Sequence, residues 1–108
     1  MRFWGLSTCD TARKALKSLR EAGIDPQVTD VRADGVTAED LAAIYAAVGD
    51  KALNKASSTW RGLSDSDKAR PVLALLAEHP TLIKRPVIAR DGDYTVGWDK
   101  ATQAKWLG

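Results

Sequence analysis

The first 31 residues constrain the fold most, because they have the pattern of a strand, a helix and a second strand. Residues 2–6 are a short, mainly apolar run. From 10 to 22, apolar side chains recur at the spacing of one helix face, and Gly23 is typical of a helix end. Residues 27–31 alternate polar and apolar side chains, as a half-buried strand does. A crossover of this length favours two parallel strands joined right-handedly, so the opening predicts an α/β fold.

The next segment indicates a helix with marked ends. Thr37, three residues before Asp40, resembles a capping box with Asp in place of the usual Glu. Apolar side chains at helical spacing follow, and Gly49 is typical of the end of a helix. We expect residues 51–55 to add a short turn of helix.

The chain then alternates between loop-like and helical sequence. Residues 56–62 are loop-like, with Trp60 as an apolar anchor. Ser64 can cap a further helix. Pro71 either interrupts that helix or begins a second one at its first position. The region from about 34 to 80 is therefore predicted to contain helices and no strand.

The end of the chain returns to strand patterns. Residues 85–89 read as a strand, the Asp-Gly pair at 91–92 is a strong hairpin signal, and 94–98 is the return strand. Asp99 can cap a short terminal helix. The sheet should therefore be mixed, with a parallel opening pair and an antiparallel closing hairpin.

Composition narrows the class of protein. The 108 residues fit one domain, and 44% hydrophobic with 28% charged residues is ordinary for a globular chain. A net charge of +2 does not favour direct nucleic-acid binding, and one cysteine with one histidine does not favour a metal site. We see no membrane span and no secretory signal, and a lone cysteine cannot form an internal disulfide. We expect a cytoplasmic monomer.

Cys9 is the candidate nucleophile, because it lies where the first strand gives way to the first helix. The helix dipole and unpaired backbone N–H groups at that position favour a thiolate. The alternative is a buried small hydrophobic residue, which is common for free cysteine. Arg13, one turn further on, either supports a thiolate or is a solvated helix residue. Thr11 either hydrogen-bonds the sulfur or caps the helix.

Three segments together resemble the ArsC family, which includes arsenate reductases, Spx and YffB-like proteins. They are Cys-Asp-Thr-Ala-Arg-Lys at 9–14, Asn-Lys followed by Ser-Thr-Trp-Arg within 54–61, and His-Pro-Thr-Leu-Ile-Lys-Arg-Pro at 79–86. The resemblance covers essentially the whole chain and is strongest to the YffB-like branch. It implies a single domain over 1–108 with a thioredoxin-like fold, a mixed sheet and an α-helical insertion at about 34–80.

The resemblance also implies roles for individual residues. Cys9 falls on the family's nucleophilic cysteine. Arg85 and Pro86 fall on an Arg-Pro peptide that is cis in the family and faces that cysteine. An arginine held there would favour the thiolate and bind an oxyanion or carboxylate bidentately. We predict Cys9 and Arg85 as catalytic residues. Residues predicted to bind the substrate or glutathione are Thr8, Thr11, Arg13, Arg61, Pro86 and Trp98.

The chain departs from the family's pattern at informative positions. Ala12 stands where the redox-switch members carry a second cysteine, so a resolving thiol must come from glutathione, a glutaredoxin or another protein. Of the three arginines of glutaredoxin-linked arsenate reductases, Arg85 alone is matched; Asn54 and Trp98 replace the others. Gly5 stands in place of a histidine. These changes argue against efficient arsenate reduction.

We therefore expect a single-cysteine thiol oxidoreductase that uses glutathione as co-substrate. Cys9 would form a mixed disulfide or an oxyanion adduct, without a metal or a bound organic cofactor. One alternative is an Spx-like regulator that binds RNA polymerase without turnover. Another is a silent member of the fold with a buried Cys9, which would be alkylated slowly until the chain unfolds.

Overall fold

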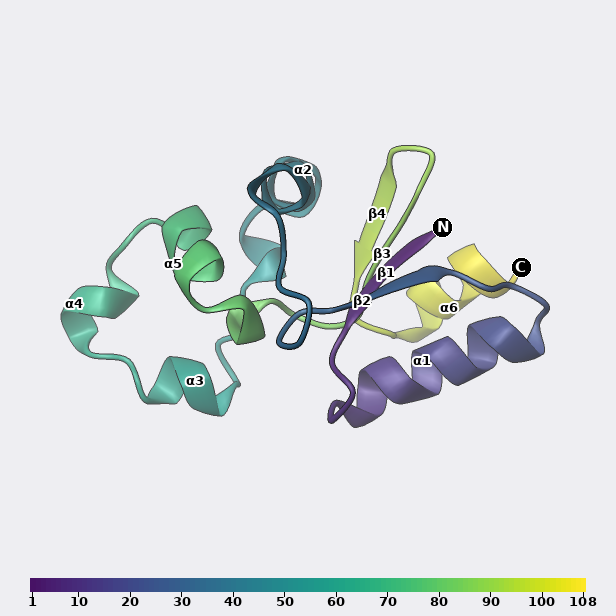
Figure 1. Ribbon diagram of the computed structural model, residues 1–108, viewed down its shortest axis with the longest axis horizontal. Helices are drawn as coiled ribbons and strands as arrows, with labels where there is room; N and C mark the ends of the chain where they lie inside the picture. Colours follow the sequence, from purple (N-terminus) through teal and green to yellow (C-terminus); the bar gives the residue numbers. More distant parts are fainter.

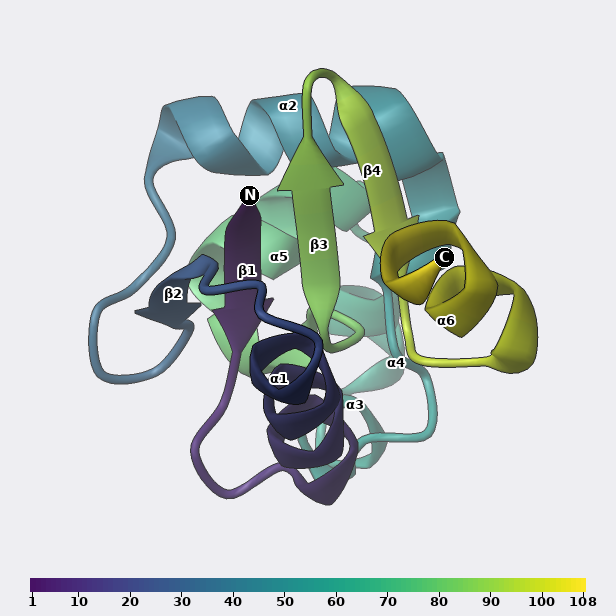
Figure 2. The same cartoon turned by 90° about the vertical axis from the view of Figure 1, so that its right-hand side faces the viewer.

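A four-stranded sheet forms the centre of the computed structural model, which describes all residues from 1 to 108. Its order is β2–β1–β3–β4, visible in Figure 2. The strands are β1 (Arg2–Gly5), β2 (Gln27–Asp30), β3 (Val87–Arg90) and β4 (Asp93–Val96). β1 is parallel to β2 and antiparallel to β3, and β3 is antiparallel to β4. The predicted mixed sheet is confirmed.

Helices cover both faces of this sheet (Figure 1). The helices α1 (Asp10–Glu21) and α6 (Lys100–Leu107) lie on one face, and α2 (Ala38–Val48) lies on the other. The short helices η1 (Gly49–Ala52), α3 (Ser58–Arg61), α4 (Asp65–Lys68), α5 (Val72–Glu78) and η2 (Pro80–Leu82) follow α2. Of these, α3, α4 and α5 lie beyond the end of the sheet at which β1 ends and β3 begins. No helix is long and apolar enough to span a membrane.

Side-chain caps explain where several helices begin. The Thr37 hydroxyl accepts a hydrogen bond from the Asp40 N–H, and the Asp99 carboxylate accepts one from the Thr102 N–H. Both caps were predicted, as was the cap of α4 by Ser64. The helix α2 ends at Gly49, whose φ of 61° is in the left-handed region that glycine tolerates.

Three sequence-based expectations need correction. The predicted loop at 56–62 contains helix α3, because the Ser57 hydroxyl accepts a hydrogen bond from the Trp60 N–H and caps a turn. Pro71 directly precedes α5 at the capping position, so it is not the first helical residue. Val28 is an apolar position of the half-buried strand predicted at 27–31, yet it is 41% exposed, because β2 is the edge strand of the sheet.

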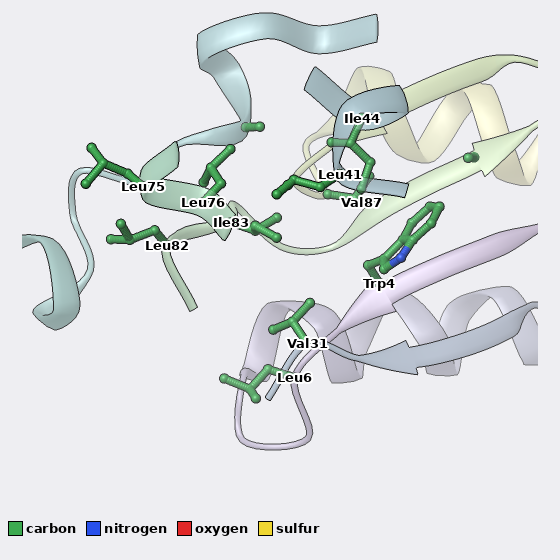
Figure 3. Packing of buried hydrophobic residues seen from close by; sticks show 12 residues of the cluster. Trp4, Leu6, Val31, Leu41, Ile44, Leu75, Leu76, Leu82, Ile83 and Val87 are labelled. Atoms are coloured by element: carbon green, nitrogen blue, oxygen red, sulfur yellow. The ribbon is translucent and has the colours of Figure 1, made fainter. Parts of the chain in front are cut away.

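Two apolar clusters lie on opposite faces of the sheet, and β1 contributes side chains to both. Its side chains alternate, so that Phe3 packs with α1 on one face while Trp4 and Leu6 pack on the other. Figure 3 shows the second, larger cluster. It joins the sheet to α2 through Leu41 and Ile44, and to the short helices through Leu75, Leu76, Leu82 and Ile83. The helical segment between β2 and β3 is therefore held to the sheet by one continuous apolar contact.

A polar contact fastens α2 to β1. The Arg2 guanidinium donates two hydrogen bonds to the Asp40 carboxylate, at 2.6 and 2.8 Å, and lies 4.4 Å from the Trp4 ring centre. Hydrogen bonding from Arg2 holds the pKa of Asp40 below its usual value, although burial acts in the opposite direction. The contact between Arg2 and Asp40 therefore contributes fully to the free energy of unfolding above the unfolded pKa of Asp40, about 3.9. This contribution is lost as pH falls through the lower pKa of the folded state.

We expect Asp40→Asn to destabilise the protein by about 1–3 kcal/mol at pH 7, because the half-buried Arg2 loses a charged partner. The difference in free energy of unfolding between the variant and wild type should become smaller in acid, because the wild-type carboxylate is then protonated. Urea unfolding at several pH values measures both effects. Glu39→Gln, an exposed acid in the same helical turn, is the control. A deficit that does not change with pH would contradict this account.

Candidate functional site

Cys9 occupies the capping position of α1, at the end of the loop that follows β1. Its N–H donates to the Leu6 carbonyl at 2.9 Å, and its carbonyl accepts from the Arg13 N–H at 3.0 Å. The side chain is half-buried and contacts both apolar clusters. The backbone of Cys9 is therefore held on both sides, and the residue stays partly exposed.

α1 differs from most of its neighbours in lacking a side-chain cap. Four other helices begin at a Thr, Ser or Asp whose oxygen accepts a backbone N–H: α2, α3, α4 and α6. At Cys9 no side-chain capping hydrogen bond is made. The first-turn N–H groups of Asp10, Thr11 and Ala12 have no intrahelical acceptor. The positive end of the α1 dipole therefore favours a negative charge close to this position.

The sheet brings a second segment to the same end of the molecule. Trp4 of β1 pairs with Val87 of β3 in antiparallel register, so the loop after β1 and the residues before β3 leave the same sheet end. The Arg85–Pro86 peptide bond is cis. The Pro86 carbonyl accepts a hydrogen bond from the Gly97 N–H at 2.9 Å, which brings the following residue, Trp98, to this end. Like Cys9, the half-buried Trp98 contacts the cluster around Phe3.

Arg85 is held by backbone carbonyls. Its Nη1 donates to the Thr81 oxygen at 2.7 Å and to the Ile83 oxygen at 3.3 Å. Its Nε is buried without a partner, whereas Nη2 makes no hydrogen bond and is not buried. No hydrogen bond joins Arg85 to Cys9. The guanidinium is thus oriented by the carbonyls of Thr81 and Ile83, and its Nη2 atom has no partner within the chain.

The other predicted binding residues lie in more open positions. Thr8 and Thr11 are exposed on either side of Cys9. Arg13 is 68% exposed, with its Nη1 3.8 Å from an Asp10 carboxylate oxygen. Arg61 is exposed on α3 and makes no ion pair. The structure therefore brings Cys9, Pro86 and Trp98 to one end of the sheet, while the cations of Arg13 and Arg61 point into solvent.

Asp30, which we did not identify from the sequence, fixes the loop before Cys9. One carboxylate oxygen accepts the Ser7 N–H at 3.1 Å, and the other accepts the N–H groups of Arg32 and Ala33 at 2.8 Å. These backbone hydrogen bonds, that from Ala33 first, hold the pKa of Asp30 below its usual value. β1 and β2 are parallel, so their carboxyl ends meet, and this placement could have identified Asp30 as a neighbour of the loop.

A small cavity of about 160 Å³ lies beside this loop, between α1 and the first two strands. Gly5 lines it, and a Cβ atom at that position would lie 2.7 Å from the Phe3 ring. A larger side chain at this position therefore requires the buried Phe3 ring to move. No group of three His, Cys, Asp or Glu residues is placed to hold a metal ion.

Comparison with known proteins identifies the family. The model of the ArsC family matches residues 4–106. The chain belongs to the ArsC family. The predicted resemblance and the thioredoxin-like α/β fold are therefore confirmed.

Individual relatives agree with this assignment. A protein of Haemophilus influenzae described as uncharacterized is 39% identical over an alignment of 102 residues. The alignment covers 90% of this chain and 90% of that protein. The solved structure of a YffB protein has 32% identity and a TM-score of 0.89, covering 98% of this chain and 97% of that one. An arsenate reductase of Rhizobium meliloti is 31% identical over 86 residues, or 74% of this chain but 61% of its own length.

We expect Asp30→Asn to loosen the loop that carries Cys9. Losing a charged acceptor should speed hydrogen exchange of the Ser7 amide by about tenfold or more. In the wild type, the same release should occur as pH falls through the lowered pKa of Asp30. Amide exchange followed by NMR measures both, with the exposed Asp25→Asn as control. Unchanged exchange at Ser7 would show that the carboxylate does not hold the loop.

Proposed function

We propose that this ArsC-family protein is a single-cysteine thiol oxidoreductase that uses glutathione as co-substrate and acts in the cytoplasm as one domain over 1–108. The observation that carries the proposal is the position of Cys9. The chain's sole cysteine stands where four other helices carry a capping oxygen, and it shares its end of the sheet with a cis Arg85–Pro86 peptide.

The first step is attack on an oxidised sulfur. The Cys9 thiolate attacks the glutathione sulfur of a mixed disulfide between glutathione and a substrate thiol. A disulfide bond forms between Cys9 and glutathione, the disulfide bond between glutathione and the substrate breaks, and the substrate leaves as its thiolate. The amides at the start of α1 support this step, because they stabilise negative charge on Cys9 before attack and when it later acts as the leaving group.

The second step requires a thiol from outside the chain. Ala12 offers no second sulfur, so free glutathione attacks the Cys9–glutathione disulfide. Glutathione disulfide leaves, and Cys9 returns as a thiolate. The substrate mixed disulfide is thereby reduced and two glutathione units are joined, so electrons and atoms balance without a metal or bound cofactor.

Arg85 supplies the anion contact in this proposal. Its Nη2, which has no partner within the chain, would donate to a glutathione carboxylate or an anionic substrate, while Nη1 stays on the backbone carbonyls. An oxyanion such as arsenate remains a candidate substrate, since the Rhizobium meliloti relative is named as an arsenate reductase. Asn54 and Trp98 in place of two arginines weaken that option, because each charge-assisted contact contributes about 1.5–3 kcal/mol.

Replacement of the nucleophile tests the proposal directly. We expect Cys9→Ser to reduce glutathione-dependent cleavage of the mixed disulfide of glutathione and mercaptoethanol to the uncatalysed background, because the alkoxide is not available at neutral pH. Ser18→Ala, a change of one oxygen further along α1, is the control and should retain full activity. Turnover that survives in Cys9→Ser would refute the mechanism.

Arg85 provides a second test. We expect Arg85→Gln to raise the KM for glutathione about tenfold or more, since one charge-assisted hydrogen bond is lost. Arg85→Lys keeps the charge and should recover part of the lost affinity, and Arg90→Gln, an exposed arginine at the other end of β3, is the control. Thermal unfolding of each variant separates loss of binding from loss of structure.

A further inference from the structure

The outer strand β4 leaves part of its backbone without hydrogen-bond partners. Just after this strand, the Gly97 N–H donates to the Pro86 carbonyl at 2.9 Å, and the antiparallel pairing with β3 continues from there. Hydrogen-bonded and non-hydrogen-bonded pairs alternate along such a ladder, so Tyr94 and Val96 direct their N–H and C=O groups away from β3. β4 is an edge strand, and no other backbone segment bonds to these groups. This edge of the sheet is therefore open to a further strand.

The opposite edge of the sheet is partly closed. In β2, Val28 and Asp30 point away from β1, because the next residue, Val31, donates its N–H to Gly5. Both outward groups of Asp30 are taken by Asp34. The Asp30 N–H donates to the Asp34 carboxylate at 2.8 Å, and the Asp30 carbonyl accepts the Asp34 N–H at 2.9 Å. Only β4 therefore offers two outward residues in succession with free backbone groups.

A cleft of about 560 Å³ lies along the open edge. Tyr94 and Val96 line it, together with residues at the end of α2, in the segment that follows α2 and at the start of α6. Figure 2 shows β4 at the outside of the sheet, with α2 on one side of it and α6 on the other. The half-buried Val48 and Leu53 make part of the cleft apolar. The cleft has the volume of a ligand site, roughly 300–1,000 Å³, and its wall includes both residues with free backbone groups.

Two exposed lysines that make no ion pair also line this cleft. Lys51 belongs to η1, and the Lys84 N–H donates to the Ala52 carbonyl at 2.7 Å, so the segments that carry the two lysines lie side by side. The Lys84 side chain reaches the end of β4, because its Cε is 3.6 Å from the position that a Cβ atom on Gly97 would take. Asp99, the one acid that lines the cleft, is already used as the cap of α6. The cleft therefore favours an anionic ligand.

We propose that the cleft beside β4 binds an extended acidic segment of a partner protein. The segment lies along β4 as an additional strand and exchanges backbone hydrogen bonds with Tyr94 and Val96. Alternate side chains of a strand point to the same face, so every second side chain of the segment enters the cleft. Carboxylates at those positions meet Lys51 and Lys84. The proposed redox chemistry takes no part in this contact, so each proposal can fail without the other.

A peptide segment uses this surface more fully than the alternatives. A small anion would contact the lysines but leave the outward N–H and C=O groups of β4 unused. A second copy of this chain would bring two further lysines to the same edge, and the acids of its β3–β4 turn, Asp91 and Asp93, already have cationic neighbours. An acidic strand supplies both the backbone pairing and the missing negative charge.

Peptide binding tests the proposal without a change to the protein. The probe is the blocked hexapeptide acetyl-Val-Glu-Val-Glu-Val-Glu-amide, titrated into the isotope-labelled protein and followed by NMR. One derivative is N-methylated at every valine and another at every glutamate. Successive N–H groups of a strand point in opposite directions, so one derivative loses those that face β4 and the other loses those that face solvent. A peptide with glutamine in place of glutamate tests the charge.

We expect one N-methylated derivative to bind about tenfold or more weakly than the other, because it cannot pair with β4. The glutamine peptide, and the double variant Lys51→Gln with Lys84→Gln, should each lower the affinity about tenfold or more. Two other exposed lysines, on α1, give the control Lys14→Gln with Lys17→Gln, which should stay within about twofold of wild type. Equal affinities of the two N-methylated peptides, or equal losses in the two lysine variants, would overturn the proposal.

Amide hydrogen exchange identifies the contact. At a peptide concentration about ten times the Kd, exchange at Tyr94 and Val96 should slow about tenfold, because only the free protein leaves these N–H groups exposed. Thr95 is the internal control, since its N–H already pairs with β3. Unchanged exchange at Tyr94 and Val96, or no binding at millimolar peptide, overturns the proposal. Slowing that grows with protein concentration alone also overturns it, because the edge would then belong to a second copy of the chain.

Discussion

The fold depends on β1, because this strand is paired along both edges and buried on both faces. It joins β2 in parallel and β3 in antiparallel register, while Phe3 faces α1 and Trp4 faces α2. The side chains of these four residues point alternately to the two faces of the sheet, so β1 contacts the helices on both sides. The same strand leads directly into the loop that carries Cys9, so the packing that stabilises the fold also sets the position of the candidate nucleophile.

Most of the fold follows from local signals in the sequence. Apolar spacing, the capping residues Thr37, Ser64 and Asp99, and the Asp-Gly turn mark elements whose hydrogen bonds form within a few residues. The missed helix α3 is short, and its cap, Ser57, lies in a run of serine and threonine that is equally typical of a loop. Periodicity placed Val28 inside, but exposure also depends on where a strand lies in the sheet.

The site was less predictable, because its contacts join residues far apart in the chain. Cys9 could be recognised, since its position between a strand and a helix is local. Asp30 could be recognised only by placing the ends of the predicted parallel strands side by side, because its contact with Ser7 exists only once β1 and β2 are paired. In the same way, the hold of Thr81 and Ile83 on Arg85 depends on how the η2 segment turns before β3. No sequence pattern specifies which edge of a guanidinium is used by the backbone.

The replacements at this site are linked by packing as well as by charge. Gly5 is in close contact with the buried Phe3 ring, so restoring a histidine there would disturb the cluster that contacts both Cys9 and Trp98. Trp98 is itself half-buried against that cluster, and an arginine in its place would carry a charge into apolar surroundings. The apolar packing at this end of the sheet thus disfavours cationic side chains at positions 5 and 98. This packing supports the proposed preference for a sulfur substrate over a small oxyanion.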